Sequence, residues 1–547
     1  MQNLKDKLQQ NLNDLVFLLE LNNENIFKIK AFKNALEIIN GLKEEDLTNQ
    51  DLLKNTKGIG KGILEFINTI NHNQEPLELT ELKSNLPISL KELTKISGLG
   101  IKRIKTLWQE LKIKNLGELE YACKENRLLS LKGFGPSIQK NITESLKAIS
   151  HNQGLLRLDQ ALEISDEIVE ILNKLDFDKI CLVGQACWQQ EIIDTISFAI
   201  LTKNIKNNIN FTYKNISINL HITNDKDNFG FFCLKLNSTK DFFDKINNLA
   251  QSKSINLEKS KFTEENDIFD ILNIHYVEPQ IRHKTSVLMH KSQTRKKLIE
   301  LTDLQGAFHN HTLASDGKNS LEEMRTQAIK LGLSYISIND HSKQAFYANG
   351  LSDELLENQL LEINKLNNDD LGKKCWLFSG TESDILANGE LDFENNTLGK
   401  LDIIIASVHM RLKQNELEMT QRLINAVKNP YTTILGHPTG RLLLARKPSI
   451  YDMEAVIKEA KNNLVALELN ANPHRLDVCE EHLVLAKELG ALICINADAH
   501  STSGLRDLNY GIMIAKRAGL SAQDVLNCQS AHDIKSWLKQ KKLKAGV

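Results

Sequence analysis

The stretch Phe308-His309-Asn310-His311, followed by Thr312–Gly317 (TLASDG), decides how the C-terminal half of this 547-residue chain is interpreted. On an extended segment side chains alternate between two faces, so His309 and His311 point the same way. Asp316 then arrives from the following loop. A strand end of this kind can present several ligands to one metal ion, although short motifs also match surface or core-edge histidines by chance. The remainder of the C-terminal half favours the metal-site interpretation.

Residues 306–547 repeat a strand-then-helix rhythm that extends outward from this stretch. Strands that are apolar throughout predict a parallel sheet covered by helices, as in an α/β barrel. In each candidate strand the polar residues lie at the C-terminal end, where such barrels carry their chemistry. The seven candidate strands are 306–311, 334–342, 375–383, 401–409, 432–438, 464–472 and 491–500.

Nine His, Asp and Glu side chains fall at or just after these strand ends, including six of the chain's fifteen histidines. They are too many for one ion, and imidazoles mixed with carboxylates suit Mn²⁺, Zn²⁺ or Fe²⁺ better than Mg²⁺ or Ca²⁺. Glu382 is the only glutamate of the set and could bridge two ions. Two or three ions can generate hydroxide near neutral pH and stabilise a phosphoryl centre. The candidate metal ligands are His309, His311, Asp316, His341, Glu382, His409, His437, Asp498 and His500.

Basic residues follow several of these strand ends and are candidates for binding a phosphodiester beside the metals. Lys343 follows the second strand, and Arg441 lies in the tight turn after the fifth strand. Arg446 and Arg475 are placed similarly, but for these two ordinary surface charge is an equally good interpretation. His474 lies in the same region as Arg475, and we do not count it as a ligand.

Residues 1–75 carry apolar residues at three- and four-residue spacing, which predicts helices. A small turn of apolar and glycine residues occurs three times between residues 56 and 138, each time leading into a helix. Its glycines can bring backbone N–H groups close to a phosphate oxygen without reading the base sequence. One copy would fit a glycine-capped helix joint equally well, but three copies followed by basic residues favour phosphate-backbone binding. The candidate DNA-binding residues are Gly58, Gly60, Lys61, Gly98, Gly100, Lys102, Arg103, Gly133 and Gly135.

Residues 151–285 mix strand-like runs with helical segments, which predicts an α+β region. The strand-like runs are KICLVGQAC, INFTYKNISINLHIT and GFFCLKLN. A basic segment follows, in which residues 282–297 include Arg282, Lys284 and four further basic residues without an acidic one. This segment is either a solvated tether or a contact for the DNA backbone, and both interpretations stay open.

The chain is longer than a single hydrophobic core usually supports, so we expect two to four domains. A formal net charge of -2 gives no global nucleic-acid signature and confines DNA contact to local patches. Eight scattered cysteines without a CxxC pair argue against a disulfide framework and against a thiolate zinc site. The sequence has no signal-peptide run and no apolar stretch long enough to span a bilayer, so we expect a cytoplasmic protein.

The C-terminal half resembles the PHP (polymerase and histidinol phosphatase) domain, in the version attached to bacterial family X DNA polymerases. The motifs that carry the resemblance are HNHTLASDG, INDHSK, GTESDI, SVH, GHPTGRLLLAR, LELNANPHRLD and NADAH. The resemblance implies a distorted (β/α)₇ barrel and a trinuclear, Mn²⁺-dependent 3′–5′ exonuclease and 3′-end-processing phosphodiesterase that acts on DNA. By the resemblance, the first ion is held by His309, His311, Glu382 and Asp498, the second by Glu382, His409 and His437, and the third by Asp316, His341 and His500. The candidate catalytic residues are Glu382, Asp498, Arg441 and Lys343.

The N-terminal half resembles the helix-hairpin-helix and nucleotidyltransferase domains of the same family, but its polymerase signature is broken. In the family a Gly-Ser turn precedes two aspartates one residue apart on a strand, and a neighbouring strand carries a third. Here Gly184 stays, whereas Gln185 replaces the serine. Asp194 matches the first aspartate, while Ile196 and Asn219 take the other two positions. Because these carboxylates hold two Mg²⁺ ions, we expect a degenerate palm and lost or very weak nucleotidyl transfer.

The lyase activity of eukaryotic relatives needs a lysine where this chain has Phe66, so we expect no Schiff-base chemistry.

The leading interpretation is a monomeric, metal-dependent DNA 3′-end nuclease of DNA repair. A working polymerase with an attached exonuclease is the main alternative. A small-molecule phosphatase is disfavoured by the three hairpin turns, and a non-catalytic DNA-binding protein by the complete ligand set. The expected domains are a hairpin domain at 1–75, a second hairpin region at 76–150, palm and thumb at 151–285, a basic linker at 286–305 and the PHP domain at 306–547.

Overall fold

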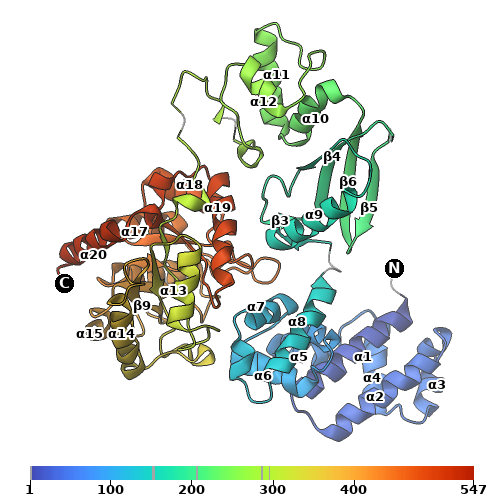
Figure 1. The fold of residues 1–547 in the computed structure, drawn as a ribbon. Coiled ribbons are helices and arrows are strands. Elements are labelled where there is room, and N and C mark those ends of the chain that lie inside the picture. The colour runs from blue at the N-terminus through green and yellow to red at the C-terminus, as the bar shows by residue number, and fades with distance from the viewer. Residues whose placement is uncertain (1–2, 151–153, 205–206, 285–286, 295) are drawn as a thin grey trace. The chain divides into compact units, whose positions relative to one another are not determined.

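The computed structural model describes residues 3–150, 154–204, 207–284, 287–294 and 296–547 (Figure 1). The chain divides into two compact units. The first unit holds residues 1–123 and 131–146, and the second holds residues 124–130 and 147–547. In the described part of the chain, no helix is both long enough and apolar enough to cross a membrane.

The first unit is helical, as the apolar spacing predicts. In its first helix Leu8, Leu12, Leu15 and Leu19 recur every three or four residues and are buried. The Asn3 side chain begins this helix by accepting a hydrogen bond from the backbone N–H of Asp6 at 2.7 Å. The helices that start in this region are α1 (Leu4–Leu21), α2 (Ile26–Gly41), α3 (Gln50–Asn55), α4 (Lys61–Asn71), α5 (Leu77–Asn85), α6 (Ile101–Leu111), α7 (Leu116–Lys124) and α8 (Pro136–Ser150).

The three predicted glycine turns share one backbone geometry. The first glycine of each turn is left-handed, with φ of +101° at Gly58, +84° at Gly98 and +88° at Gly133. Only glycine adopts these values without strain. The second glycines, Gly60 and Gly100, are the N-cap residues of α4 and α6, and Gly135 directly precedes α8. Each turn therefore ends at a helix start that carries unsatisfied backbone N–H groups.

The second unit begins with a mixed sheet of strand order β2-β4-β6-β5, in which β4 and β6 are parallel and the outer pairs are antiparallel. A short antiparallel pair, β1 with β3, lies outside this sheet. The strands are β1 (Leu156–Arg157), β2 (Lys179–Val183), β3 (Ile192–Ile193), β4 (Thr195–Leu201), β5 (Ile209–Tyr213) and β6 (Ile216–Thr223). The helices are α9 (Leu158–Leu172), α10 (Phe229–Leu236), α11 (Lys240–Ser252) and α12 (Glu265–Ile271).

The prediction of a strand at GFFCLKLN is wrong, because this run forms helix α10. A short apolar run cannot be assigned to strand or helix by periodicity alone. In α10, Phe229 and Cys233 pack against strand residues such as Val183 and Ala199, while Leu234 packs into a separate cluster with α11 and α12. The helix is apolar on both sides because it is buried on both sides.

Part of the basic segment at residues 282–297 is interior rather than a solvated tether. Arg282 is 1% exposed, and its guanidinium lies 2.5 Å from Glu265 and donates to the Val277 carbonyl at 2.9 Å. Lys284 lies 2.9 Å from Glu480, the first residue of helix α18 (Glu480–Leu489). These two residues therefore hold packed structure together. Of the other predicted linker residues, 285, 286 and 295 lie outside the described residues.

Residues 306–547 form a nearly closed barrel of seven parallel strands in sequence order, as predicted. A parallel bridge between Asn310 and Ala499 joins the first strand's end to the last. The strands are β7 (Gly306–Ala307), β8 (Tyr335–Ile338), β9 (Trp376–Asp384), β10 (Ile403–Ser407), β11 (Ile434–Leu435), β12 (Ala466–Asn470) and β13 (Ile493–Asn496). The helices are α13 (Leu321–Lys330), α14 (Asp353–Asn367), α15 (Asn395–Leu398), α16 (Glu416–Lys428), α17 (Met453–Asn462), α18 (Glu480–Leu489), α19 (Leu508–Arg517) and α20 (Ala531–Ala545).

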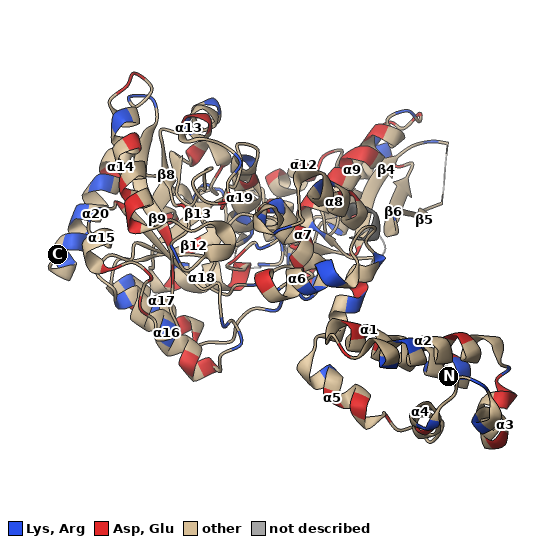
Figure 2. Cartoon of the chain, turned by 90° about the horizontal axis from the view of Figure 1, so that it is seen from below, with Lys and Arg blue, Asp and Glu red and all other residues tan. Residues whose placement is uncertain are grey.

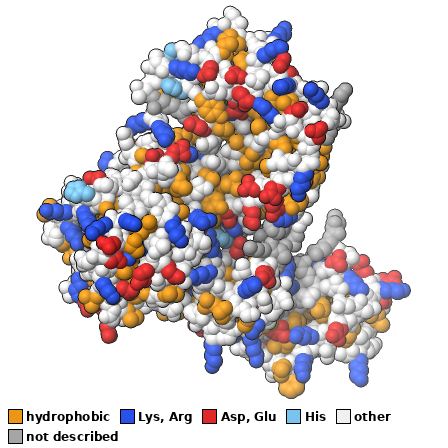
Figure 3. All heavy atoms as spheres, viewed as in Figure 1, with side chains coloured by type: hydrophobic (Ala, Val, Ile, Leu, Met, Phe, Trp, Pro, Cys, Tyr) orange, Lys and Arg blue, Asp and Glu red, His pale blue; other side chains and the backbone are white. Residues whose placement is uncertain are grey.

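Charged side chains of both signs are interspersed over the helices of each unit (Figure 2). Figure 3 shows the same interspersion on one face of the molecule. This distribution agrees with the net charge of -2. Contact with a polyanion would therefore have to be local.

We expect Gly58→Ala to destabilise the first glycine turn. The φ of +101° is strained for alanine, and a Cβ at this position would lie 2.7 Å from Ile38 Cδ1. The matched control is Gly62→Ala within α4, where a Cβ meets nothing within 4 Å and helix propensity favours alanine. In hydrogen-exchange mass spectrometry, amides of Lys61–Asn71 should exchange faster in Gly58→Ala and no faster in Gly62→Ala. Equal exchange in both variants would contradict this expectation.

Candidate metal centre

The C-terminal ends of the barrel strands bring all nine predicted ligands together. Six of the seven strands contribute, from β7 to β11 and β13, and the loop after β7 adds Asp316. Three of the ligand residues have positive φ, namely His309 (+40°), His437 (+25°) and Asp498 (+52°). Such backbone is costly for non-glycine residues and is typical of functional sites. Here the turned backbone aims the side chains inward at the strand ends.

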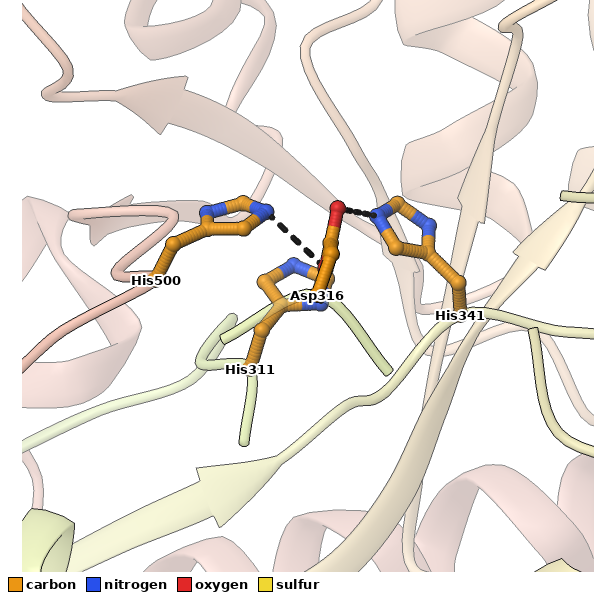
Figure 4. Close-up of side chains that lie close together, drawn as sticks. All are labelled: His311, Asp316, His341 and His500. Atoms are coloured by element: carbon orange, nitrogen blue, oxygen red, sulfur yellow. Dashed lines mark ion pairs between the residues drawn. The ribbon is translucent and has the colours of Figure 1, made fainter. Parts of the chain in front are cut away.

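One group of ligands surrounds Asp316. Figure 4 shows its carboxylate between the imidazoles of His341 and His500, with His311 beside it. Asp316 Oδ2 lies 3.5 Å from His341 Nε2, and Oδ1 lies 3.3 Å from His500 Nε2. One ligand atom from each of the four residues lies within 4.8 Å of the others. The four side chains can therefore share one ion.

Glu382 occupies the middle of the remaining ligands. Its Oε1 lies 3.3 Å from His309 Nε2, 3.2 Å from His409 Nε2 and 2.9 Å from His437 Nε2. Its Oε2 lies 2.9 Å from His341 Nδ1, on the side of the Asp316 group. The two oxygens thus face different imidazoles, which is the geometry expected of a carboxylate that bridges two ions.

Asp498 completes the set between these two groups. Its Oδ1 lies 3.4 Å from His309 Nε2 and accepts a hydrogen bond from His311 Nε2 at 3.1 Å. The three residues form one further group whose ligand atoms lie within 4.8 Å of each other. The nine residues therefore form overlapping groups in which His309, His311, His341 and Glu382 are shared.

The residues present fit a cluster of divalent ions. Among the described residues, several buried ligand atoms make no hydrogen bond, although buried polar atoms are almost always satisfied. Bound cations would satisfy them, and the mixture of imidazole and carboxylate suits Zn²⁺, Mn²⁺ or Fe²⁺. The atoms concerned are His309 Nε2, His311 Nδ1, Asp316 Oδ2, both ring nitrogens of His341, Glu382 Oε2, His437 Nδ1 and His500 Nε2.

The electrostatics of the centre separate the ligands into charged and neutral groups. Burial lowers the pKa of His437 to about 4, and burial with the nearby His500 lowers the pKa of His311 to about 4. Burial also disfavours charge on Asp316, but His500 and His341 outweigh it and hold the pKa of Asp316 well below its usual value. The same carboxylate raises the pKa of His500 to about 9 despite burial. Protons and metal ions therefore compete for these atoms.

Two carboxylates that sequence reasoning missed orient the histidines. Glu468 on β12 accepts from His309 Nδ1 at 2.7 Å and from the backbone N–H of His437 at 2.7 Å. Asp384 at the end of β9 forms a short hydrogen bond with His409 Nδ1. In both histidines Nε2 is left to face the centre, because the other ring nitrogen is held from behind. The sequence signal that could have identified them is their position: Glu468 lies within the apolar sixth strand, and Asp384 lies two residues after the candidate ligand Glu382.

Asp340 supports the loop that carries Asp316. Its carboxylate accepts hydrogen bonds from Thr312 N at 2.7 Å, Thr312 Oγ1 at 2.6 Å, Ser315 Oγ at 2.5 Å and Gln359 Nε2 at 2.6 Å. Four donors on one buried carboxylate fix the loop in place. Asp340 thus acts as a scaffold for Asp316.

The predicted phosphate-gripping residues lie at the edge of the barrel with partners of their own. Lys343 is 3.5 Å from Asp353 and lies over the Phe393 ring. Arg441 is 2.7 Å from Glu191 and donates to the Arg475 carbonyl at 3.0 Å. Use of Arg441 on a phosphate would need its ion pair with Glu191 to open, and its role stays a prediction.

The residues predicted to form a degenerate polymerase signature lie after β2, directly before and on β4, and on β6. Gln185, in place of the family's serine, accepts hydrogen bonds from the backbone N–H of Asp194 at 3.0 Å and of Thr195 at 3.3 Å. Asp194 is exposed, while Ile196 is completely buried in the core shared with the barrel. Asn219 is on β6 in register with Ser197. The loss of the polymerase site stays a prediction.

The other predicted residues lie in the first unit. Lys61 and Lys102 are exposed at the starts of α4 and α6. Arg103 donates to the Gly98 carbonyl at 2.7 Å, so its guanidinium closes the second glycine turn. Phe66 is buried on α4 and packs edge-on against Phe32 at 5.8 Å. The DNA-contact roles of the basic and glycine residues stay predictions.

Comparison with known proteins extends over almost the whole chain. The chain is 30% identical over 567 residues to the DNA polymerase/3′-5′ exonuclease PolX of Bacillus subtilis, covering 97% of this chain and 98% of that protein. It is 31% identical over 255 residues to a probable phosphatase of Thermoanaerobacter sp., covering 44% of this chain and 96% of that protein. A histidinol phosphate phosphatase structure from Lactococcus lactis aligns with 40% of this chain and 94% of that chain, at 18% identity and a TM-score of 0.31, too low to support an inference. No family model matches.

The seven-stranded parallel barrel, with imidazoles and carboxylates clustered at its strand ends, is consistent with a PHP-type domain. In this chain the domain follows a helical region with three glycine turns and an α+β region. The chain belongs to the PolX family of bacterial family X DNA polymerases with a C-terminal PHP domain.

We expect Glu468→Gln to weaken metal binding, although residue 468 is not a ligand. The amide offers one acceptor oxygen in place of two, so it cannot accept from both His309 Nδ1 and the His437 backbone N–H, and at least one of these hydrogen bonds is lost. Mn²⁺ affinity, measured by electron paramagnetic resonance titration, should fall about 10–100-fold. The control is Glu357→Gln on the exposed face of α14, which should bind Mn²⁺ like the unmodified protein. Unchanged affinity in a folded Glu468→Gln protein would refute this positioning role.

Proposed function

We propose that the chain is a DNA-binding, metal-dependent 3′–5′ exonuclease and 3′-end-processing phosphodiesterase of DNA repair. It would use two or three divalent ions, with Mn²⁺ as the preferred metal. The observation that carries this proposal is the complete set of nine buried ligands, in which atoms without hydrogen bonds face one another. A monomeric, cytoplasmic protein remains part of the prediction.

The chemistry follows from what the ligands and their surroundings do. When bound, the ions would supply hydroxide near neutral pH and stabilise negative charge on a phosphodiester. The ionised Asp316, Glu382 and Asp498 neutralise the positive charge that such a centre gathers. The ligand side chains are at most 6% exposed, so bulk water is largely excluded and charge interactions are strong. Lys343 and Arg441 are the proposed contacts for the phosphodiester outside the centre.

DNA is the substrate class that the rest of the chain favours. The three glycine turns each end at a helix start, where backbone N–H groups can bind phosphate oxygens without sequence preference. The Bacillus subtilis relative is named as a DNA polymerase and 3′-5′ exonuclease. A small-molecule phosphatase, which the names of other relatives suggest, would have no use for these turns.

We further propose that the α+β region no longer transfers nucleotides. A two-ion polymerase site needs several carboxylates to offset the ions and the triphosphate. Here Ile196 lies in the hydrophobic core and Asn219 is neutral, so Asp194 would have to hold both ions. The relative's name makes an active polymerase the second candidate function.

We expect the purified protein to release 3′ nucleotides from 3′-labelled single-stranded DNA with Mn²⁺, and not with excess chelator. The double variant His309→Ala with His311→Ala should lose at least about 100-fold in rate, because it removes two ligands outright. The matched control is His532→Ala, an exposed histidine on α20 that should act like the unmodified protein. If nucleotide release were absent, or survived in the double variant, the proposed nuclease would be excluded.

We expect no primer extension beyond background with either Mg²⁺ or Mn²⁺ when a primed template and all four nucleotides are present. The exonuclease would obscure extension, so the assay uses the His309→Ala and His311→Ala background. Robust extension that Asp194→Ala abolishes would show that the polymerase site works with a reduced carboxylate set, and would favour the second candidate function.

A further inference from the structure

A short segment outside the barrel lies over the metal centre. Residues Lys124–Ser130 belong to the second compact unit, although Lys124 ends helix α7 and the other six residues lie between α7 and α8 in the chain. Lys124 Nζ donates to Asp507 at 2.8 Å, and Asn126 Nδ2 donates to the Asp316 carbonyl at 3.4 Å. The Ser130 hydroxyl donates to the Tyr347 carbonyl at 3.3 Å. We call this segment the cap, because three of its residues are bonded to loops at the barrel mouth.

Glu125 of the cap points into the centre. One of its carboxylate oxygens lies within 4.8 Å of ligand atoms of both Asp498 and His500. Its side chain is 1% exposed, and within the described residues neither oxygen makes a hydrogen bond. It is thus a tenth potential ligand, and the only one among the described groups that comes from outside the barrel.

The buried negative charge of Glu125 and Asp498 favours the binding of cations. Burial raises the pKa of Glu125, since the carboxylate has lost its water; Arg127 and His500 oppose this rise, and Asp498 adds to it. The Arg127 guanidinium lies 2.6 Å from Glu125 Oε2 and compensates part of its charge. Asp498 brings a second buried carboxylate to the same place, so further cations would be stabilised there. Bound divalent ions between Glu125 and Asp498 would provide that compensation.

The position of the cap also bears on access. Parallel barrels open to ligands at the C-terminal ends of their strands, which is where the cap lies. With the cap in place the side chains of His309 and His311 have 0% exposure and those of Asp316 and Glu382 have 3% and 1%. A phosphodiester of DNA cannot reach ligands that are this deeply covered. Something at the mouth has to move before substrate binds.

We propose that Glu125 is a displaceable ligand of the metal centre, and that the cap closes the centre until a phosphate of DNA takes the place of this carboxylate. Carboxylate and phosphodiester oxygens are both anionic and bind the same hard or borderline cations, so one can replace the other. The Asp316, His341 and His500 group lies next to Glu125 and is the subsite concerned. The proposal rests on the metal-dependent phosphodiesterase proposed above.

The test uses the full-length protein and Glu125→Gln, which keeps the shape of the side chain and removes its charge. Without DNA, Mn²⁺ affinity should fall about tenfold or more, as for loss of a ligand or its close partner. With single-stranded DNA and saturating Mn²⁺, KM should fall about threefold or more, because a closed state that excludes substrate loses its advantage. The matched control is Glu110→Gln, an exposed glutamate on α6, which should change neither quantity.

A second measurement monitors the cap itself. In hydrogen-exchange mass spectrometry, Mn²⁺ should protect the amides of 124–130, and thymidine 5′-monophosphate, a phosphate competitor, should remove that protection. Glu125→Gln should show no Mn²⁺-dependent protection of this segment.

Unchanged Mn²⁺ affinity in a folded Glu125→Gln protein would overturn the proposal, because Glu125 would then not be a ligand. Weaker affinity with a lower kcat and an unchanged KM would also overturn it, by making Glu125 a permanent ligand. If the unmodified protein bound Mn²⁺ but released no nucleotides, the proposed nuclease would fail separately. The Mn²⁺ titration and the exchange measurement would still decide whether Glu125 closes the centre.

Discussion

The structure depends on a single constraint, which is that the ends of parallel strands in a closed sheet must meet. The meeting point is occupied by Glu382, whose two oxygens face the imidazoles of His309, His409 and His437 on one side and His341 on the other. A buried carboxylate surrounded by imidazoles is stable only with protons or cations between them. The barrel thus fixes the position of the centre, and because it buries carboxylates there, the centre is stabilised by bound cations or protons.

The surroundings of the ligands keep this arrangement in one geometry. Glu468 and Asp384 are hydrogen-bonded to Nδ1 of His309 and His409, respectively, so Nε2 of each ring faces the centre. Asp340 ties down the loop of Asp316 through four donors. A first layer of ligands is therefore held by a second layer of carboxylates, and both layers belong to the rigid sheet and its loops.

The α+β region is integrated with the barrel. Ile196 and Ile218 belong to the same continuous hydrophobic cluster as barrel residues such as Leu467, and Glu191 pairs with Arg441 of the barrel. Ile196, at the position where the resemblance expects an aspartate, is completely buried in this cluster and adds apolar surface to it. The region therefore contributes to the packing of the second unit.

The sequence by itself determined the local features. Seven apolar runs ending in polar residues predicted the barrel and the place of its nine candidate ligands, and glycines between apolar residues predicted three turns that each lead into a helix. Tertiary structure decided what depends on distant partners: α10 became a helix because both of its sides are covered, and Arg282 became interior through Glu265. Glu125 meets Asp498 across more than three hundred residues of chain. Periodicity and propensity act over a few residues, whereas packing joins residues that no local pattern relates.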